Sequence, residues 1–315
     1  MDQNRSTPPN QAGDAGDQSV EEGAAPGQET VPAAASPAGP GRIVLAATPI
    51  GNVGDASARL IELLTTADIV AAEDTRRLHR LVQNLGVTVG GRVISYHEHN
   101  EVAKTAELLD HVRSGKTLVM VTDAGMPSVS DPGFRLVEGA VAAGLTVTAV
   151  PGPSAVLTAL ALSGLPTDRF CFEGFLPRKA GERSSRLADL DAERRTMVFF
   201  EAPHRLEPML RALRERFGAD RRAAVCRELT KTYEEVIRGS LRELLEWAEG
   251  NEVRGEIAVV VGGAPAREPG KPEDHVAAVN ALIAQGVRLK EAVAAVAEDT
   301  RVSKRELYSA VLAAR

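Results

Sequence analysis

Residues 121–133, VTDAGMPSVSDPG, concentrate side chains that can do chemistry. Two Asp, two Ser, two Gly and two Pro fall within thirteen residues, directly after an apolar run. Carboxylates can take a proton or hold a polar ligand, glycines let a ligand approach the backbone, and prolines stiffen a loop. The segment is therefore either a crowded turn or part of a ligand-binding site.

Four other short segments share this composition: TPIGN (48–52), EDTR (73–76), HEHN (97–100) and PGPSA (151–155). Across the five segments, the candidate proton acceptors are Glu73, Asp74, His97, Glu98 and Asp123. Asp74 has a structural alternative, because a carboxylate there can cap the next helix and pair with an arginine. Residues 97–100 can likewise form a hydrogen-bonded helix start. We expect no metal at His97 and His99, because no third ligand has suitable spacing.

Each of these segments follows a predicted strand. Apolar runs predict strands at 42–47, 68–72, 92–96, 117–121 and 145–150. Helical periodicity predicts helices between them at 58–66, 77–85, 102–114 and 133–143. The alternation is typical of an α/β domain with a largely parallel sheet. Because ligands bind at the carboxyl ends of such strands, we expect the five segments to form one site.

The second half of the chain repeats this pattern with different residues. Strands are predicted at 170–175, 196–200, 223–227 and 257–261, and helices at 183–194, 206–217 and 241–249. Residues 161–166 read as a linker, and Ser303 opens the last of three C-terminal helices. We therefore predict four parts: a disordered acidic tail at 1–40, an N-terminal α/β domain at 41–160, a C-terminal α/β domain at 161–266 and a helix-turn-helix-like extension at 273–315.

Composition favours a cytoplasmic globular protein. Hydrophobic residues make up 43 % and charged residues 25 %, which is ordinary for a folded domain. No apolar run approaches the ~18 residues of a membrane-spanning helix, and we see no secretory signal. Two cysteines, Cys171 and Cys226, are too few for a disulfide framework or a zinc cluster.

Charge is unevenly spread. Residues 1–40 hold six acidic residues against Arg5, so most of the formal net charge of −6 lies there. Residues 176–231 instead hold fourteen Lys and Arg against nine Asp and Glu. A basic zone in a near-neutral body indicates a polyanionic partner, although arginines on solvated helix faces are the alternative.

The loops exclude two common nucleotide sites. The sequence has neither a phosphate-binding G-x-x-x-x-G-K-[ST] loop nor a G-x-G-x-x-G after the first strand. Glycines at 125, 133 and 152, between prolines, instead predict stiff loops that present backbone groups. Such loops suit a polar, mostly uncharged ligand such as an adenosine with an amino-acid tail.

The five segments, in this order, resemble the signatures of the ribosomal small-subunit methyltransferase I family. So do LSGLPTDRFCFEGFLPRK (162–179), FFEAPHRL (199–206), RELTKTYEE (227–235) and RGEI (254–257). The resemblance runs from about residue 42 to 261 and implies the two-domain tetrapyrrole-methylase fold, a class III S-adenosylmethionine methyltransferase, with a C-terminal helical extension. It also implies a homodimer, and 2′-O-methylation of a decoding-centre cytidine (position 1402) in 16S rRNA within the 30S subunit. Related tetrapyrrole enzymes carry a Gly-Asp-Pro turn where this chain has Asp123, and the difference favours the RNA branch.

The resemblance implies which residues bind S-adenosylmethionine. These are Pro49, Gly51, Asp123, Ala124, Gly125, Met126, Pro127, Pro151, Gly152, Pro153, Ser154, Ala155, Glu201, Ala202, Gly255 and Glu256. Methyl transfer to a ribose hydroxyl needs an in-line approach and a proton acceptor. Asp74, Glu73 and His97 are the predicted catalytic residues.

The predicted RNA contacts are Arg76, Arg77, Arg178, Lys179, Arg183, Arg205, Lys231, Lys304 and Arg305. Lys304 and Arg305 have an alternative, because the last helix can instead serve dimerisation. Two other functions remain open at this point. One is a C-methyltransferase for a small tetrapyrrole-type molecule, and the other is an rRNA-binding factor without enzymatic activity.

Overall fold

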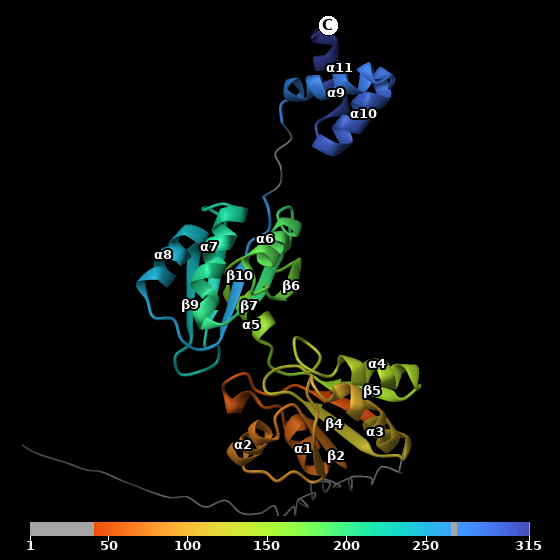
Figure 1. The fold of residues 1–315 in the computed structure, drawn as a ribbon, viewed down its shortest axis with the longest axis vertical. Coiled ribbons are helices and arrows are strands. Elements are labelled where there is room, and N and C mark those ends of the chain that lie inside the picture. Colours follow the sequence, from red (N-terminus) through yellow and green to blue (C-terminus); the bar gives the residue numbers. More distant parts are fainter. Residues whose placement is uncertain (1–40, 266–269, 315) are drawn as a thin grey trace, which may run out of the picture. The chain divides into compact units, whose positions relative to one another are not determined.

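The computed structural model describes residues 41–265 and 270–314. The tail predicted at 1–40 lies outside the described residues. Two α/β domains come first along the chain, and a group of helices ends it (Figure 1). Within the described residues, no helix is both long and apolar enough to cross a membrane.

The first domain is built on a fully parallel sheet. Its strands are β1 (Arg42–Ala46), β2 (Ile69–Ala72), β3 (Arg92–Ser95), β4 (Thr117–Val121) and β5 (Thr146–Val150). They lie in the order β3-β2-β4-β1-β5. The parallel sheet and the five strands predicted from the sequence are confirmed.

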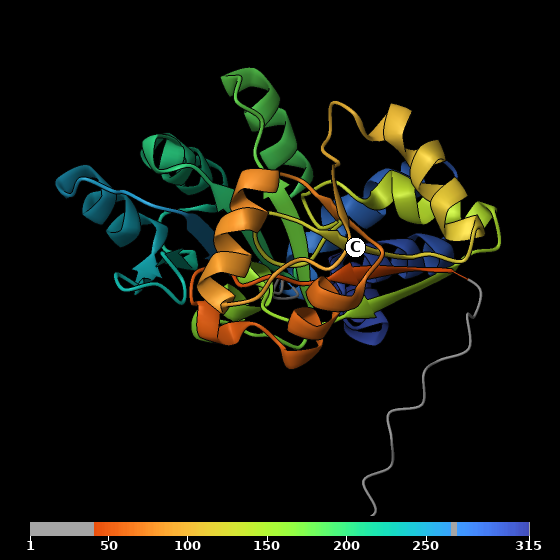
Figure 2. The same ribbon diagram turned by 90° about the horizontal axis from the view of Figure 1, so that it is seen from below.

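Helices cover both faces of this sheet. They are α1 (Ala58–Thr66), α2 (Thr75–Leu85), α3 (Glu101–Arg113) and α4 (Phe134–Ala142), with a short 3-10 helix at Val53–Asp55. Successive residues of a strand point to opposite faces of the sheet. Val44 packs in the core between the sheet and helices α1 and α2, and Ile43 packs in the core between the sheet and helices α3 and α4. The two helix pairs lie apart in both ribbon views (Figures 1 and 2). A strand buried on both faces is apolar throughout, which explains runs such as residues 69–72.

The strand order fixes where a ligand can bind. After β1 the chain crosses to β2 on one side, and after β4 it crosses to β5 on the other. Because β1 and β4 are neighbours, the loops at their carboxyl ends leave in opposite directions and open a crevice. Residues 48–52 and 121–133 are those two loops.

The second domain has a mixed sheet. Its strands are β6 (Phe170–Phe175), β7 (Thr196–Glu201), β8 (Arg222–Arg227), β9 (Glu235–Ser240) and β10 (Ile257–Val261), in the order β6-β7-β10-β8-β9. Only β6 and β7 run parallel; the other pairs are antiparallel. Strand β9 is not predicted from the sequence, because EVIRGS is half exposed and carries two charged residues and a glycine.

Helices α6 (Ala180–Asp189), α7 (Leu206–Phe217) and α8 (Leu241–Gly250) accompany this sheet, with a 3-10 helix at Pro203–Arg205. The basic helix predicted at 183–194 therefore begins and ends earlier. A core cluster joins α7 and α8 to the strands through Leu210, Leu245 and Phe199.

A further helix, α5 (Ala155–Leu162), takes in the first two residues of the linker predicted at 161–166, and residues 163–166 lie outside any helix or strand. Val156, Ala159 and Leu160 pack against Val198 and Val260 of the second sheet. The sequence AVLTALAL is apolar all round and so shows no helical periodicity. The predicted domain boundary after residue 160 falls inside α5, and the packing favours a boundary before it.

The C-terminal helices form a body with its own core. They are a 3-10 helix at Pro272–His275, α9 (Val276–Ala284), α10 (Leu289–Thr300) and α11 (Lys304–Ala313). Val279, Val293 and Leu307 are buried among them. Ser303 accepts a hydrogen bond from the Glu306 N–H (3.4 Å) and begins α11 as predicted.

The core of the second α/β domain yields a stability prediction. Phe199 of β7 is 0 % exposed, whereas Phe134 at the start of α4 is 65 % exposed. We expect Phe199→Ala to lower the free energy of unfolding of the second domain by about 3–5 kcal/mol, because it leaves a cavity in a close-packed core. The matched control, Phe134→Ala, should change it by less than about 0.5 kcal/mol. Urea unfolding measures both, and equal effects would contradict the prediction.

Candidate active site

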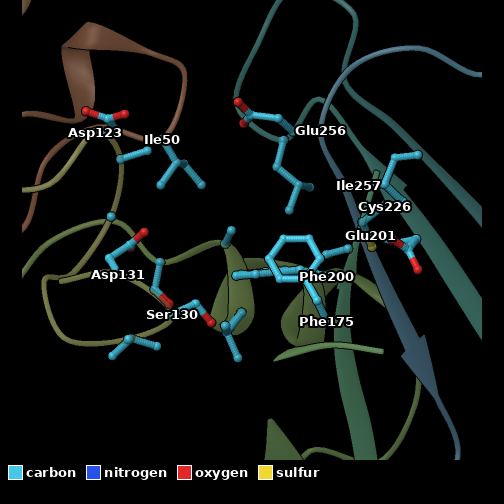
Figure 3. Close-up of a pocket in the computed structure, with 18 of the residues that line it drawn as sticks. Ile50, Asp123, Ser130, Asp131, Phe175, Phe200, Glu201, Cys226, Glu256 and Ile257 are labelled. Carbon is cyan, nitrogen blue, oxygen red and sulfur yellow. The ribbon is translucent and has the colours of Figure 1, made fainter. Parts of the chain in front are cut away.

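A cavity of about 470 Å³ opens between the two α/β domains. Its volume lies in the range of roughly 300–1,000 Å³ typical of small-molecule sites. Figure 3 shows Asp123, Ser130 and Asp131 of the first domain on one side and Glu201, Cys226 and Ile257 of the second on the other. The site therefore needs both domains.

Hydrogen bonds tie the loop after β1 to the loop after β4. The Thr48 N–H donates to the Gly125 carbonyl (2.9 Å) and the Gly125 N–H to the Thr48 carbonyl (3.1 Å). The Thr48 hydroxyl also donates to the Thr122 carbonyl (3.2 Å). Gly125 has φ +77°, a left-handed conformation that favours glycine. The crevice wall is therefore rigid without a ligand.

A second set of contacts joins the domains at the edge of this crevice. The Asn52 N–H donates to Thr230 Oγ1 (3.1 Å). Gly51 approaches so closely that a Cβ there would lie 2.5 Å from Lys231 Cγ and 2.7 Å from Thr230 Oγ1. Gly51 thus permits the first domain to pack against residues 229–231 of the second.

Most of the predicted cofactor residues line the cavity. These are Asp123, Ala124, Gly125, Met126, Ser154, Ala155, Glu201, Ala202, Gly255 and Glu256. The others, Pro49, Gly51, Pro127, Pro151, Gly152 and Pro153, do not line it. Pro49 borders a smaller cavity beside it, Gly51 lies at the domain contact, and a Cβ on Gly152 would lie 3.0 Å from Ala47 Cβ.

The cavity also has an apolar wall and one carboxylate that are not predicted from the sequence. The apolar residues are Ile50, Val129, Phe175, Phe200, Leu229 and Ile257, and the rings of Phe175 and Phe200 pack edge to face at 5.9 Å. The missed carboxylate is Asp131. Its SDPG sequence lies inside the polar segment 121–133, so a local signal for Asp131 exists. Phenylalanines in strands, by contrast, give no signal that separates a cavity wall from a core.

Three carboxyl groups gather on the first-domain side. Glu73 Oε2 accepts a hydrogen bond from the Asp123 N–H (3.2 Å), and Arg77 Nε lies 3.2 Å from Asp123 Oδ2. Burial raises the pKa of Glu73 and of Asp123, and Arg77 opposes both shifts. Burial, followed by the negative charges of Glu73 and Asp123, raises the pKa of Asp131 to about 7.

Asp74 and His97 do not line the larger cavity. Asp74 accepts from the Arg76 N–H (2.8 Å) at the start of α2 and pairs with the Arg76 guanidinium (2.8 Å). These hydrogen bonds from Arg76 hold the pKa of Asp74 well below its usual range, which favours the capping alternative. His97 follows β3, the edge strand, and its ring lies 3.2 Å from Asn100 Nδ2, as the helix-start alternative requires.

The second domain contributes a buried carboxylate with a free oxygen. Glu201 Oε1 accepts from the Ala202 N–H (2.9 Å) and lies 3.2 Å from Arg205 Nε. Within the described residues, Glu201 Oε2 and Asp123 Oδ1 are buried without a hydrogen-bond partner. Burial raises the pKa of Glu201, and Arg205 opposes the shift. Two unpartnered acceptors that line one cavity are a place for the donors of a ligand.

Several predicted RNA contacts already form ion pairs with carboxylates of the protein. The Arg205 side chain is only 19 % exposed and also donates to the Leu176 carbonyl (2.7 Å), so it supports Glu201 rather than a surface. Lys231 pairs with Glu228 (2.8 Å) and Glu256 (3.1 Å). Arg76 and Arg77 pair with Asp74 and Asp123. Arg76 and Arg77 are nevertheless exposed, with 84 % and 56 % of the side chain accessible. Arg178, Lys179, Lys304 and Arg305 are exposed as well, and Arg183 is half-buried.

Comparison with known proteins agrees with this architecture. The family model of the Tetrapyrrole (Corrin/Porphyrin) Methylases matches residues 42–245, so the chain is a tetrapyrrole-methylase-class protein. The methyltransferase CobJ has the same fold, with a TM-score of 0.55 and 21 % identity over 72 % of this chain and 96 % of that one. Uroporphyrin-III C-methyltransferase from Thermus thermophilus, solved with S-adenosylhomocysteine, gives a TM-score of 0.50 and 20 % identity over 70 % and 96 %.

Sequence relatives place the chain more narrowly. A protein of Mycobacterium tuberculosis named ribosomal RNA small subunit methyltransferase I is 51 % identical over 87 % of this chain and 96 % of its own length. One of the same name from Halalkalibacterium halodurans is 42 % identical over 85 % and 94 %. The chain belongs to the ribosomal RNA small subunit methyltransferase I family.

The domain contact gives one prediction. Gly51→Ala should lower the free energy of unfolding by about 1–3 kcal/mol, because the new methyl group overlaps Thr230 and Lys231. Gly181→Ala is the control, since a Cβ there meets nothing within 4 Å. Chemical denaturation measures both, and a Gly51→Ala protein as stable as the wild type would show that the loops do not touch in solution.

The cluster of carboxyl groups formed by Glu73, Asp123 and Asp131 gives a second prediction. The pKa of Asp131 rises from 3.8 to about 7 on folding, so the folded protein keeps a proton that the unfolded chain has lost, and stability falls as the pH rises through this window. Asp131→Asn removes the charge. We expect its gain in melting temperature to be near zero at pH 4 and full above pH 7. The exposed control Asp168→Asn should show no such dependence in the same thermal scans, and a gain independent of pH would contradict the shift.

Proposed function

We propose that this protein methylates the 2′-hydroxyl of a decoding-centre cytidine, position 1402, in 16S rRNA. Family membership makes the chain an rRNA methyltransferase that uses S-adenosylmethionine. The observation that carries the proposal is the cavity between the two domains, since the loops that resemble the family's motifs form its walls. The chemistry of its lining supports the choice of methyl donor.

The cavity fits S-adenosylmethionine in charge and in polarity. Five carboxylates line it, from Glu73, Asp123, Asp131, Glu201 and Glu256, while Arg77 is the basic residue among the described lining residues. A donor with a positive sulfonium and an amino group suits such a lining. Unpartnered oxygens of Asp123 and Glu201 can accept its hydrogen bonds, and Ile50, Met126 and Phe200 offer apolar surface.

Protein residues supply binding, positioning and proton transfer. S-adenosylmethionine supplies an activated methyl group. Residues 123–126 and 154–155 would hold it against the first sheet, and Glu201, Ala202, Gly255 and Glu256 would hold it from the second. The apolar wall excludes water, which strengthens the electrostatic interactions inside the cavity. Of the predicted catalytic residues, Glu73 lies at the cavity, whereas Asp74 and His97 do not line it.

RNA would approach from the side of β6 and α6. Phe175 lines the cavity, and Arg178, Lys179 and Arg183 follow it within eight residues. Contacts from these residues to phosphates would give a salt-dependent affinity, and the target nucleotide would have to leave its stack to reach the cavity. The same proposal takes the 30S subunit as the substrate, a homodimer as the active form and the cytoplasm as the location.

Mapping of 2′-O-methylation tests the function. In a strain that lacks this gene, 16S rRNA should lose one 2′-O-methyl group, at cytidine 1402, and a plasmid copy should restore it. Purified protein with labelled S-adenosylmethionine should transfer label to 30S subunits from that strain and not to a tetrapyrrole precursor. Unchanged rRNA methylation, label in the tetrapyrrole, or calorimetry that detects no cofactor binding would each refute the proposal.

A further inference from the structure

Asp131 is the carboxylate of the cavity that no protein group bonds among the described residues. It lies in the loop between β4 and α4, eight residues beyond Asp123. Figure 3 shows the two aspartates on the same side of the cavity. The residue is half-buried, so its carboxyl group is partly shielded and still accessible from the cavity.

A strained loop holds Asp131 in this place. Ser128 and Ser130 have φ values of +73° and +62°, which non-glycine residues rarely adopt. The Ser128 N–H donates to the Pro132 carbonyl (3.2 Å) and closes the loop. Gly133 has φ +133°, and a Cβ there would lie 2.7 Å from Ser128 Oγ. Strain of this kind persists only where the surroundings enforce it, and it concentrates at functional sites.

Every other carboxylate that lines the cavity already has a partner. Asp123 pairs with Arg77, and Glu73 accepts from the Asp123 N–H. On the opposite side Glu201 pairs with Arg205, and Glu256 with Lys231. Within the described residues, the only groups that shift the pKa of Asp131, besides burial, are the like charges of Glu73 and Asp123, and no hydrogen bond or cation stabilises its carboxylate. Both of its oxygens are therefore available to a ligand.

We propose that Asp131 is the proton acceptor for the attacking ribose hydroxyl, an inference that rests on the function proposed above. The hydroxyl oxygen forms a bond to the methyl carbon as the bond between that carbon and sulfur breaks. The electron pair of the broken bond stays on sulfur, which becomes a neutral thioether. The hydroxyl proton moves to a carboxylate oxygen of Asp131, so one proton is taken for each methyl group transferred.

The charges that face Asp131 suit this role. Glu73 and Asp123 raise its pKa after burial, to about 7. Arg77, the basic residue on this side of the cavity, pairs with Asp123. Glu201 and Glu256, which face Asp131 from the second domain, are acidic and therefore supply no cation either. A carboxylate with an ordinary pKa is a weak base, whereas one that titrates near neutral pH accepts a proton more readily and is still half ionised at pH 7.

The rate should follow this ionisation. Because only the ionised form accepts a proton, kcat/KM should rise with pH to about 7 and level off above it. Bound donor brings a positive charge, which favours the ionised carboxylate and lowers its pKa. The acidic limb of kcat should therefore lie at lower pH than that of kcat/KM.

Two variants separate Asp131 from its neighbour. Asp131→Asn should lose about 10²–10⁴-fold in kcat, the range that general-base catalysis supplies, and its remaining rate should lack the acidic limb. Glu73→Gln should keep an acidic limb but move it to lower pH, because it removes one of the charges that raise the pKa of Asp131. Asp131→Glu should recover part of the rate. Asp168→Asn, a change of an exposed aspartate, should leave the rate unchanged. The assay is methyl transfer to undermethylated 30S subunits between pH 5 and 9.

Binding and titration provide readouts that do not depend on turnover. Calorimetry should show that Asp131→Asn binds S-adenosylmethionine within about threefold of the wild type, which also establishes that the variant folds. Carboxyl NMR, with Asp131→Asn as the assignment control, should show a group that titrates near pH 7 and disappears in the variant. Loss of donor binding, an unchanged kcat, or an acidic limb that only Glu73→Gln removes would each overturn the assignment. A wild-type protein inactive on 30S subunits would instead refute the proposed function.

Discussion

The site depends on one constraint: the connections that follow two neighbouring parallel strands cross the sheet in opposite directions. β1 and β4 pair side by side, but the chain leaves them toward opposite edges of the sheet. No helix can then cover both carboxyl ends, and the loops at 48–52 and 121–133 face an open crevice. The Thr48–Gly125 hydrogen bonds turn these loops into one rigid wall, so a ligand meets a surface whose order does not depend on its binding.

The second domain completes what the first leaves open. Its sheet is mixed, with β10 antiparallel to both neighbours, and the ends of β7 and β10 that face the crevice carry Glu201 and Ile257. Helix α5 packs on this second sheet although it directly follows the PGPSA loop of the first domain. Gly51 and Thr230 meet across the boundary. The cavity is therefore a product of domain packing, and its acidic lining comes from both sides.

The charges of neighbouring residues explain why carboxylates at or near the site have different roles. Asp74 is solvated and held by Arg76, so it stabilises a helix start and stays ionised. Glu201 is buried, and Arg205 beside it opposes the rise of its pKa, while its second oxygen has no hydrogen-bond partner among the described residues. Asp131 is partly buried beside the like charges of Glu73 and Asp123, and it has no cationic partner among the described residues. The same functional group thus serves as cap, ligand acceptor or base according to its neighbours.

The sequence by itself determined the order of elements in the first domain, the edge where chemistry is concentrated and the family. Local signals suffice for these, because apolar runs, turn residues and motif order are properties of neighbouring positions. Only the tertiary structure decided that Phe200 and Ile257 face a cavity rather than a core, that β9 completes the second sheet and that α5 belongs with it. It also decided that Arg205 and Lys231 are held in ion pairs while Asp131 stands unpaired among the described residues. Burial and pairing depend on residues far away in the chain, and no periodicity records which distant side chain will be the neighbour.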